Sequence, residues 1–322
     1  MSEFPSKVVD RSWTVYRSSP MVGLSTENLE DAQESLKVSL AREFDTVSKD
    51  EESTSIESTY LPGNSGTCVD VTVKVLERND ENKDVNKPVK PLSCRILICS
   101  TSEQVDGNKL PVFPSKFILV KGRQSLLKSV FKWLVVHFDC TIGSAPLCIS
   151  PYHLAEIAAK VSEETPTTET TSEDKVSQSK EPQPMELEFT LPEAVASAGL
   201  RRMTVAIPQD SLGILFTDSR KHQSARFDES QDAHMKTQIL QGSNLVAMSD
   251  VAEEPFLLSA VYEFVACQLS IELRGASLTR IATPSVVVSS DGRVKFLREE
   301  AVKGMILFFA SLSKPESAED EE

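Results

Sequence analysis

His137, Asp139 and Cys140 stand close together in the sequence, at the end of an apolar stretch with helical spacing, residues 125–138. An imidazole beside a thiol can activate the sulfur as a nucleophile. No third group that would orient the imidazole is evident nearby. A histidine at a helix end is also favoured there as a cation, because the helix dipole is negative at that end. An unrecognised cysteine-dependent enzyme using Cys140 and His137 therefore stays open as an alternative, but nothing in the sequence requires it.

The sequence lacks the motifs of other catalytic or cofactor chemistry. It contains no glycine-rich nucleotide fingerprint and no HExxH pair, and Gly63–Gly66 lacks the lysine and the helix of a phosphate-binding loop. The six cysteines include no CxxC pair, so buried free thiols are expected in place of a zinc site or disulfides. We therefore predict no enzymatic activity, no cofactor and no metal site.

The formal net charge of −14 is unevenly distributed along the chain. Most of the excess acid lies in Glu27–Glu57, Glu163–Glu181 and Glu316–Glu322, which leaves the remainder close to neutral. The folded part can therefore still present a basic surface to nucleic acid. No apolar run reaches the roughly 20 residues that cross a bilayer, and residues 1–10 lack the apolar core of a signal peptide. We expect no membrane contact and a location in the cytosol or nucleus.

Hydrophobic periodicity divides the chain into strands and helices. Glu51–Gly66 is rich in Ser, Thr and Gly and is predicted to be a loop, and Asp291-Gly292 between two β-rich runs predicts a hairpin. A helix is predicted to begin near Ser25, and further helices are Ser125–Phe138, Ser150–Val161, Pro255–Leu269 and Glu299–Ser313. The predicted strands are Trp13–Arg17, Cys68–Leu76, Cys94–Ser100, Lys116–Lys121, Met185–Leu191, Met203–Ile207, Leu278–Ala282, Ser285–Ser290 and Arg293–Leu297.

Runs of strands followed by helices, without regular alternation, predict an α+β fold. We expect largely antiparallel sheets flanked by helices, with a C-terminal β-hairpin plus helix. Residues 162–184 are acidic and rich in Ser, Thr and Pro, so they cannot bury enough apolar area to offset their ordering entropy. The predicted organisation is an N-terminal α+β sub-domain at 11–161, a disordered acidic linker at 162–184, a C-terminal α+β sub-domain with a partner-binding sheet at 185–313, and an acidic tail at 314–322.

The C-terminal hairpin and the helix after it are apolar on both sides. Continuous apolar strands are normal in sheets that are covered on both faces. The protein's own elements could supply that cover, or the sheet could be shared with another chain by edge pairing or face packing. We predict the second arrangement. The predicted partner-binding residues are Val286, Val287, Val288, Val294, Phe296, Leu297 and Phe308.

Basic residues are frequent in the same C-terminal part of the chain. If they gather on a sheet, they form a surface that contacts phosphate groups, whereas scattered residues form an ordinary solvated face. The predicted DNA-binding residues are Arg201, Arg202, Arg274, Arg280, Arg293, Lys295 and Arg298.

Three segments carry recognisable signatures in a fixed order. The first is Trp13-Thr14-x-Tyr16 followed by Ser19-Pro20, and the second is Phe138-Asp139-Cys140 followed by Pro146-Leu147 and a helix. The third is Leu278-Thr279-Arg280-Ile281, then SDGRVKFL at Ser290–Leu297, then an apolar helix. Together they resemble the centromere protein L family. The order of elements agrees from Trp13 to about Ser313, whereas Glu51–Gly66, Glu77–Pro91, Ser162–Pro184 and Arg220–Gln241 match nothing in that family.

This resemblance implies a non-enzymatic subunit of the constitutive inner kinetochore, located in the nucleus at the centromere. It implies heterodimerisation with centromere protein N through the C-terminal β region, association with other inner-kinetochore subunits, and basic surfaces facing centromeric nucleosome DNA. We expect the isolated chain to aggregate or to form a homodimer. A cytosolic scaffold without DNA contact is the remaining alternative, and a DNA affinity that does not change with salt would favour it.

Overall fold

The chain forms two compact units. Unit 1 comprises residues 1–148 and 285–322, and unit 2 comprises residues 149–284. The structure is a computed structural model, and it describes residues 4–44, 53–60, 66–75, 92–100, 112–164, 183–196, 199–212, 256–271, 273 and 275–312.

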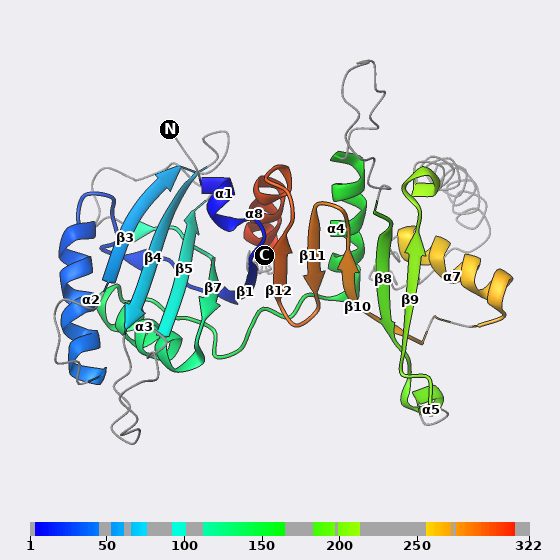
Figure 1. The fold of residues 1–322 in the computed structure, drawn as a ribbon, viewed down its shortest axis with the longest axis horizontal. Helices are drawn as coiled ribbons and strands as arrows, with labels where there is room; N and C mark the ends of the chain where they lie inside the picture. Colours follow the sequence, from blue (N-terminus) through cyan, green and yellow to red (C-terminus); the bar gives the residue numbers. More distant parts are fainter. Residues whose placement is uncertain are drawn as a thin grey trace, which may run out of the picture. The chain divides into compact units, whose positions relative to one another are not determined.

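Unit 1 is built around an antiparallel sheet, whose strand order within the unit is β3-β4-β5-β7-β1-β12-β11 (Figure 1). A separate ribbon pairs β2 (Met21–Val22) with β6 (Val112–Phe113). The sheet strands are β1 (Ser12–Arg17), β3 (Ser53–Tyr60), β4 (Thr67–Val75), β5 (Leu92–Ser100), β7 (Phe117–Gly122), β11 (Val286–Ser289) and β12 (Arg293–Phe296). The helices are α1 (Phe4–Val8), α2 (Leu29–Phe44), α3 (Gln124–His137) and α8 (Glu300–Leu312).

Helices pack on both faces of the unit 1 sheet. On one face, α2 and α3 bury alternate strand residues such as Val71. On the other face, the ring centroid of Phe309 in α8 lies 5.8 Å from that of Phe117 in β7. The indole Nε1 of Trp13 donates a hydrogen bond to the Val8 carbonyl oxygen of α1 over 3.1 Å. Because successive strand residues point to opposite faces, strands covered on both sides are apolar almost throughout.

The N-terminal strand β1 lies between β7 and the C-terminal strand β12. Val15 pairs with Leu119 on one side, and Trp13 pairs with Val294 on the other. The two ends of the chain therefore complete one sheet, which is why residues 285–322 group with unit 1. This grouping differs from the predicted sub-domains at 11–161 and 185–313, because a division drawn along the sequence does not anticipate a strand pair formed by the two chain ends.

A buried ion pair connects β4, β5 and α1 in unit 1. Arg95 Nε donates to Asp70 Oδ1 over 2.8 Å, and the same guanidinium pairs with the second carboxylate oxygen. Arg95 Nη1 also donates to the Lys7 carbonyl oxygen over 3.1 Å, and its guanidinium lies 5.9 Å from the ring centroid of Trp13. The hydrogen bond to Asp70 raises the pKa of Arg95. These contacts satisfy two charges that would be costly to bury singly.

Unit 2 contains three antiparallel strands in the order β10-β8-β9. The strands are β8 (Met185–Thr190), β9 (Arg202–Ile207) and β10 (Ser277–Ala282), and the helices are α4 (Pro151–Glu164), α5 (Glu193–Ala196) and α7 (Phe256–Leu269). Strand β8 alternates, because Leu187 and Phe189 are buried whereas Glu188 is half-buried. The Phe189 ring centroid lies 5.9 Å from that of Tyr262 in α7, and α4 packs against β10.

The predicted fold class is confirmed, because the structure is α+β and mostly antiparallel, with a C-terminal hairpin and helix. The loop predicted at Glu51–Gly66 is wrong, because this stretch contains β3, which pairs with β4 and buries Ile56. The Ile56 N–H also donates to Gln33 Oε1 of α2 over 3.1 Å. Thr and Ile are frequent in strands, because their branched side chains pack well on a pleated, half-buried surface. Most of the predicted linker, and the acidic tail, lie outside the described residues.

Candidate functional site

The β11–β12 hairpin holds the C-terminal apolar residues in a fixed register, with Val288 paired to Val294. Its turn requires a glycine, because Gly292 has a φ of +78° and a Cβ there would lie 2.5 Å from the Leu147 carbonyl oxygen. Residues with side chains rarely adopt such a positive φ. The hairpin predicted from Asp291-Gly292 is thus confirmed.

Most of the predicted partner-binding side chains are buried within this chain. Alternate residues of β11 and β12 lie on the sheet face that α8 covers. The chain's own fold covers these side chains, so they are not themselves accessible to a partner. Val287 and Leu297 are half-buried and remain accessible to a partner. The buried residues, none more than 5% exposed, are Val286, Val288, Val294, Phe296 and Phe308.

The predicted DNA-binding residues are divided between the two units. Arg274 lies outside the described residues. Unit 1 contains Arg293, Lys295 and Arg298, and unit 2 contains Arg201, Arg202 and Arg280.

Carboxylates neutralise several of these cations. In unit 2, Glu188 pairs with Arg202 over 3.1 Å and with Arg280 over 3.5 Å. In unit 1, Arg293 Nε pairs with Asp291 over 3.1 Å. Such partly exposed pairs contribute little stability, but they reduce the charge available to a phosphate. Within the described part of the chain, the predicted DNA-binding residues without an ion pair are Arg201, Lys295 and Arg298.

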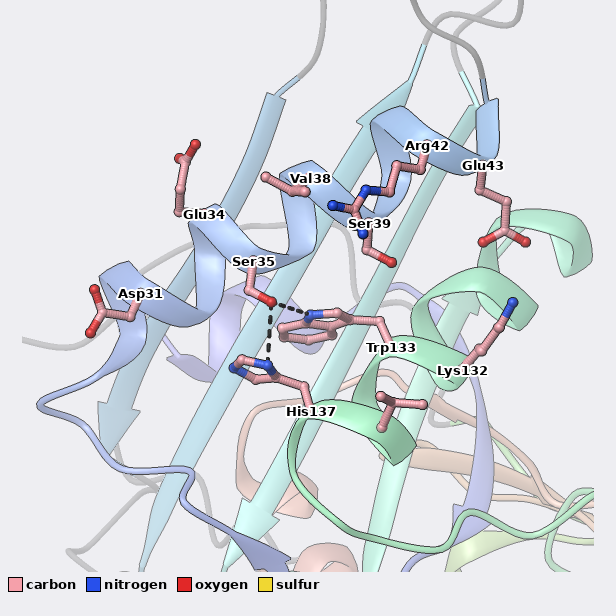
Figure 2. Close-up of a pocket in the computed structure, with 11 residues that line it drawn as sticks. Asp31, Glu34, Ser35, Val38, Ser39, Arg42, Glu43, Lys132, Trp133 and His137 are labelled. Carbon is pink, nitrogen blue, oxygen red and sulfur yellow. Dashed lines mark hydrogen bonds between the residues drawn. The ribbon is translucent and has the colours of Figure 1, made fainter.

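An open groove of about 900 Å³ lies between α2 and α3 in unit 1 (Figure 2). The indole Nε1 of Trp133 donates to Ser35 Oγ over 3.2 Å, and Ser35 Oγ lies 3.2 Å from His137 Nδ1. The rings of Trp133 and His137 stack with their centroids 5.3 Å apart. These contacts join the two helices across the groove.

The groove combines apolar and charged side chains. Val38 and Val136 are 44% and 79% exposed at its sides, and Figure 2 shows Asp31 and Lys132 among the charged residues around it. In the described residues, the only hydrogen bond of the His137 imidazole is to Ser35, so no carboxylate orients it as in a catalytic triad. Sequence reasoning missed this arrangement, because Ser35 and its two partners are far apart in the chain.

In a comparison with protein families, the model of centromere protein L matches residues 7–321. The chain belongs to the centromere protein L family. Membership places its role at the inner kinetochore and its location at the nuclear centromere, and it implies association with other subunits of the centromere complex. A search of the curated proteins gives no match.

Two of the centromere protein L signatures lie together in unit 1. The first begins in β1 and ends at Ser19-Pro20, and the second begins at Phe138 just after α3. The Thr141 N–H donates to Ser19 Oγ over 2.8 Å, and the Val22 N–H donates to the Phe138 carbonyl oxygen over 2.8 Å. These signatures therefore build the fold by fixing the chain after β1 against the end of α3.

The cysteine–histidine pair of the enzyme alternative is not assembled in this centromere protein L family member. Cys140 is 3% exposed, and its Sγ donates to the Leu134 carbonyl oxygen over 3.4 Å. Burial raises the pKa of the Cys140 thiol. Because the thiolate is the reactive form, this thiol is a poor nucleophile. The described residues show no hydrogen bond between Cys140 and His137, and the family is one of structural kinetochore proteins.

The remaining cysteines divide by exposure. Cys68, Cys94 and Cys99 are buried free thiols, as predicted, whereas Cys148 and Cys267 are exposed free thiols. Among the residues with described positions, no group of three or more His, Cys, Asp or Glu is arranged to hold a metal ion. No helix found there is both long enough and apolar enough to cross a bilayer.

Proposed function

We propose that this chain pairs with centromere protein N through its C-terminal β region. The heterodimer then helps to anchor the centromere-associated network to centromeric DNA for chromosome segregation. The observation that carries this proposal is the family match over residues 7–321, which includes every element of the C-terminal β region. The hairpin supports it because its strands are paired and its core side chains are buried, which offers a preformed surface that loses little conformational entropy on binding.

The partner contact is assigned to the apolar side chains that the C-terminal region leaves accessible. Val287 on β11 and Leu297 after β12 are half-buried, and Leu307 on α8 is 42% exposed. The five buried residues of the predicted set keep the hairpin and α8 together, so their substitution would unfold the region rather than report on binding.

Co-expression with centromere protein N tests the heterodimer. The double substitution Val287→Asp and Leu297→Asp should lower co-purification at least about tenfold, because two charges would be buried in an apolar contact. Leu307→Asp tests the second surface separately. Val136→Asp is the matched control, since Val136 is 79% exposed on α3 in a different part of unit 1. Undiminished co-purification of both C-terminal variants, with folded protein, would reject this interface.

The DNA contact is assigned first to Lys295 and Arg298, which are the unpaired members of the predicted set in unit 1. Neutralising two phosphate-contacting cations should reduce the dependence of log affinity on log salt by about two. The Lys295→Gln and Arg298→Gln heterodimer should show this change on a short mixed-sequence duplex. A wild-type affinity that is flat with salt would favour the scaffold without DNA contact. Sedimentation of the chain alone measures the predicted self-association.

A further inference from the structure

The groove between α2 and α3 is lined by one face of each helix. The α2 residues that line it recur every three or four positions, which places them along a single helix face. They include Asp31, Ser35, Val38 and Arg42, and Val136 lines the groove from α3. At 1.5 Å per residue, the α2 side is about 16 Å long from Asp31 to Arg42, or about three helical turns. The groove is therefore long enough to hold a helix of about that length.

The exposed apolar side chains of this groove do not belong to the core of unit 1. In that core α2 buries Leu36 and α3 buries Leu134. By contrast, Val38 is 44% exposed and Val136 is 79% exposed. Single exposed valines are common on protein surfaces, but these two line one groove together with the indole of Trp133. They form an apolar strip that nothing in the described part of the chain covers.

The groove is preformed, because side-chain contacts join the two helices at its base. Ser35 Oγ accepts a hydrogen bond from Trp133 Nε1 over 3.2 Å and lies 3.2 Å from His137 Nδ1. Small-molecule pockets enclose most of their ligand, whereas this groove is open along its outer side (Figure 2). An amphipathic helix suits an open groove, because it inserts its apolar face and leaves its other face in water. A preformed groove also lowers the entropy cost of docking.

The groove is acidic where α2 begins. Figure 2 shows Asp31 and Glu34 there, at the end away from Arg42. Within the described residues Asp31 forms no ion pair, and Glu34 pairs only with Lys37, over 3.4 Å. Both members of that pair are exposed, so the pair is weak and leaves Glu34 able to bind another cation.

The opposite end of the groove carries charges of both signs. Arg42, Lys132 and Glu43 line it, and residues 45–52, which follow α2, lie outside the described residues. The two carboxylates at the start of α2 therefore define the charge that a partner must match. A partner with basic side chains at that end complements them.

We propose that the groove between α2 and α3 binds an amphipathic α-helix from another polypeptide. The bound helix places apolar side chains on Val38 and Val136 and lysine or arginine side chains beside Asp31 and Glu34. Bases are favoured in the last turn of a helix, because the helix dipole is negative there. The bound helix therefore runs antiparallel to α2, with its C-terminal turn at Asp31. This surface is separate from the C-terminal β region that the proposed pairing with centromere protein N uses.

The probe is a synthetic helical peptide of about 15 residues, which is about four turns. It carries leucines spaced three and four residues apart and lysines in its last turn. A hydrocarbon link keeps it helical, because an isolated helix of this length is marginal in water. The peptide lacks tryptophan, so the emission of Trp133 in the full-length chain reports docking, whereas Trp13 is 1% exposed in the core. The wild-type chain should show a saturable change in emission.

Two adjacent valines on α3 give a matched pair of variants. Val136→Asp places a charge in the apolar contact and should weaken peptide binding at least about tenfold. Val135→Asp introduces the same charge at a 39% exposed position that is not among the described residues lining the groove, and it should retain wild-type affinity. Thermal melting followed by circular dichroism checks that both variants are folded.

A charge reversal tests the chemistry of the partner. Asp31→Lys with Glu34→Lys should weaken binding of the lysine peptide about tenfold, and should strengthen binding of the same peptide with glutamates in its last turn. Glu193→Lys with Asp210→Lys changes the net charge equally at exposed positions of unit 2 and should leave both affinities unchanged. A reversed chain that still prefers the lysine peptide would overturn the proposed recognition.

Other results would also overturn the helix site. Equal peptide binding by Val136→Asp and Val135→Asp would place the peptide elsewhere on the chain. Equal binding of a peptide with the same composition but scattered leucines would show charge attraction without helix docking. If Val136→Asp alone abolished self-association in sedimentation, the groove would belong to a second copy of this chain. Pairing with centromere protein N is tested separately, because the peptide binds the chain directly and Val136→Asp should leave that pairing intact.

Discussion

The two units use the same ingredients, antiparallel strands and apolar helices, but cover their sheets differently. In unit 1, α2 and α3 lie on one face while α1 and α8 lie on the other. In unit 2, α4 and α7 pack against one face of a three-stranded sheet, and Thr190, Arg202 and Thr204 on the other face are exposed. The difference explains why residues 96–99 of β5 are all apolar and buried, whereas β8 alternates between apolar and charged residues.

The comparison also separates packing from binding. The chain's own α8 buries the apolar face of the unit 1 hairpin, so the apolar residues of that face serve the fold. Only the half-buried apolar residues of the hairpin remain accessible to a partner. The charged face of unit 2 is internally balanced, because Glu188 pairs with both Arg202 and Arg280. Among the predicted DNA-binding residues in the described part of the chain, Arg201, Lys295 and Arg298 form no ion pair. The type of a residue in the sequence, apolar or basic, therefore indicates a binding role less directly than the neighbours that bury or pair with its side chain in the fold.

The largest effect should come from a core residue of the doubly covered sheet. Phe296→Ala removes a fully buried ring on β12 and should lower the free energy of unfolding of unit 1 by about 4 kcal/mol. Thr204→Ala, on the exposed face of unit 2, should change the free energy of unfolding of unit 2 by less than about 0.5 kcal/mol, which hydrogen exchange of the β9 amides measures. Denaturant unfolding followed by tryptophan fluorescence reports on unit 1, because Trp13 and Trp133 both lie there. Equal small losses would contradict the difference between the units.

Breaking the buried ion pair should have the next largest effect. Asp70→Asn leaves the Arg95 guanidinium, whose side chain is only 13% exposed, without a carboxylate, and should cost about 3 kcal/mol. Glu34→Gln breaks the exposed pair with Lys37 and serves as the control, with an expected cost below about 0.5 kcal/mol. The same fluorescence titration measures both. A loss for Asp70→Asn no larger than for the control would show that the pair is not desolvated.

Alkaline pH should weaken unit 1 through a buried thiol. Burial raises the pKa of Cys94 to about 12, whereas an unfolded thiol titrates near 8.5. Between these values the unfolded chain releases a proton that the folded chain keeps. Stability is therefore retained below about pH 8.5 and falls as the pH rises towards 12, by up to about 1.4 kcal/mol per pH unit.

Cys94→Ala isolates this effect, because it removes the thiol from β5. Unfolding titrations from about pH 8 to about pH 10.5 should show a shallower decline for the variant than for the wild type. Cys148→Ala, at an exposed thiol, is the control and should leave the wild-type slope unchanged. Parallel curves for wild type and Cys94→Ala would assign the alkaline loss to other groups.

The smallest effect is expected on the charged face of unit 2. Glu188→Gln removes the carboxylate shared by Arg202 and Arg280, whose side chains are 74% and 42% exposed. Solvent screening limits the cost to below about 1 kcal/mol. Hydrogen exchange of the β8 amides should accelerate no more than about fivefold, in line with that figure. A global loss of protection would show that Glu188 holds the sheet together.

Local sequence patterns predicted helices and strands well where the apolar residues recur with a single spacing. Strand β4 was predicted from the alternation of Val69–Val75, and helix α3 from the helical spacing of residues 125–138. The β11–β12 hairpin was predicted from the Asp291-Gly292 turn. Strand β3 was missed because its Ser and Thr residues are common in loops, and only its pairing with β4 and its contact with α2 make it a strand.

The arrangement of the site could not be predicted in the same way. Ser35 comes from α2, whereas Trp133 and His137 come from α3, and only the packing of these two helices brings their polar atoms together. The burial of Phe296 could not be separated from partner binding by sequence alone, because an apolar side chain is compatible with either. Charge and hydropathy are properties of single residues. Whether a charge is paired and whether an apolar side chain is buried depend on neighbours that the whole fold supplies.

The position of β1 between β7 and β12 sets an order for synthesis. During translation Trp13 is synthesised about 280 residues before its strand partner Val294. A nascent chain must therefore keep the Trp13 strand with one unpaired edge until β12 has been made, which is a state prone to misassembly. A transcript truncated before residue 293 would yield a protein whose opening strand never acquires its second neighbour, a natural target for chaperones and quality-control proteolysis.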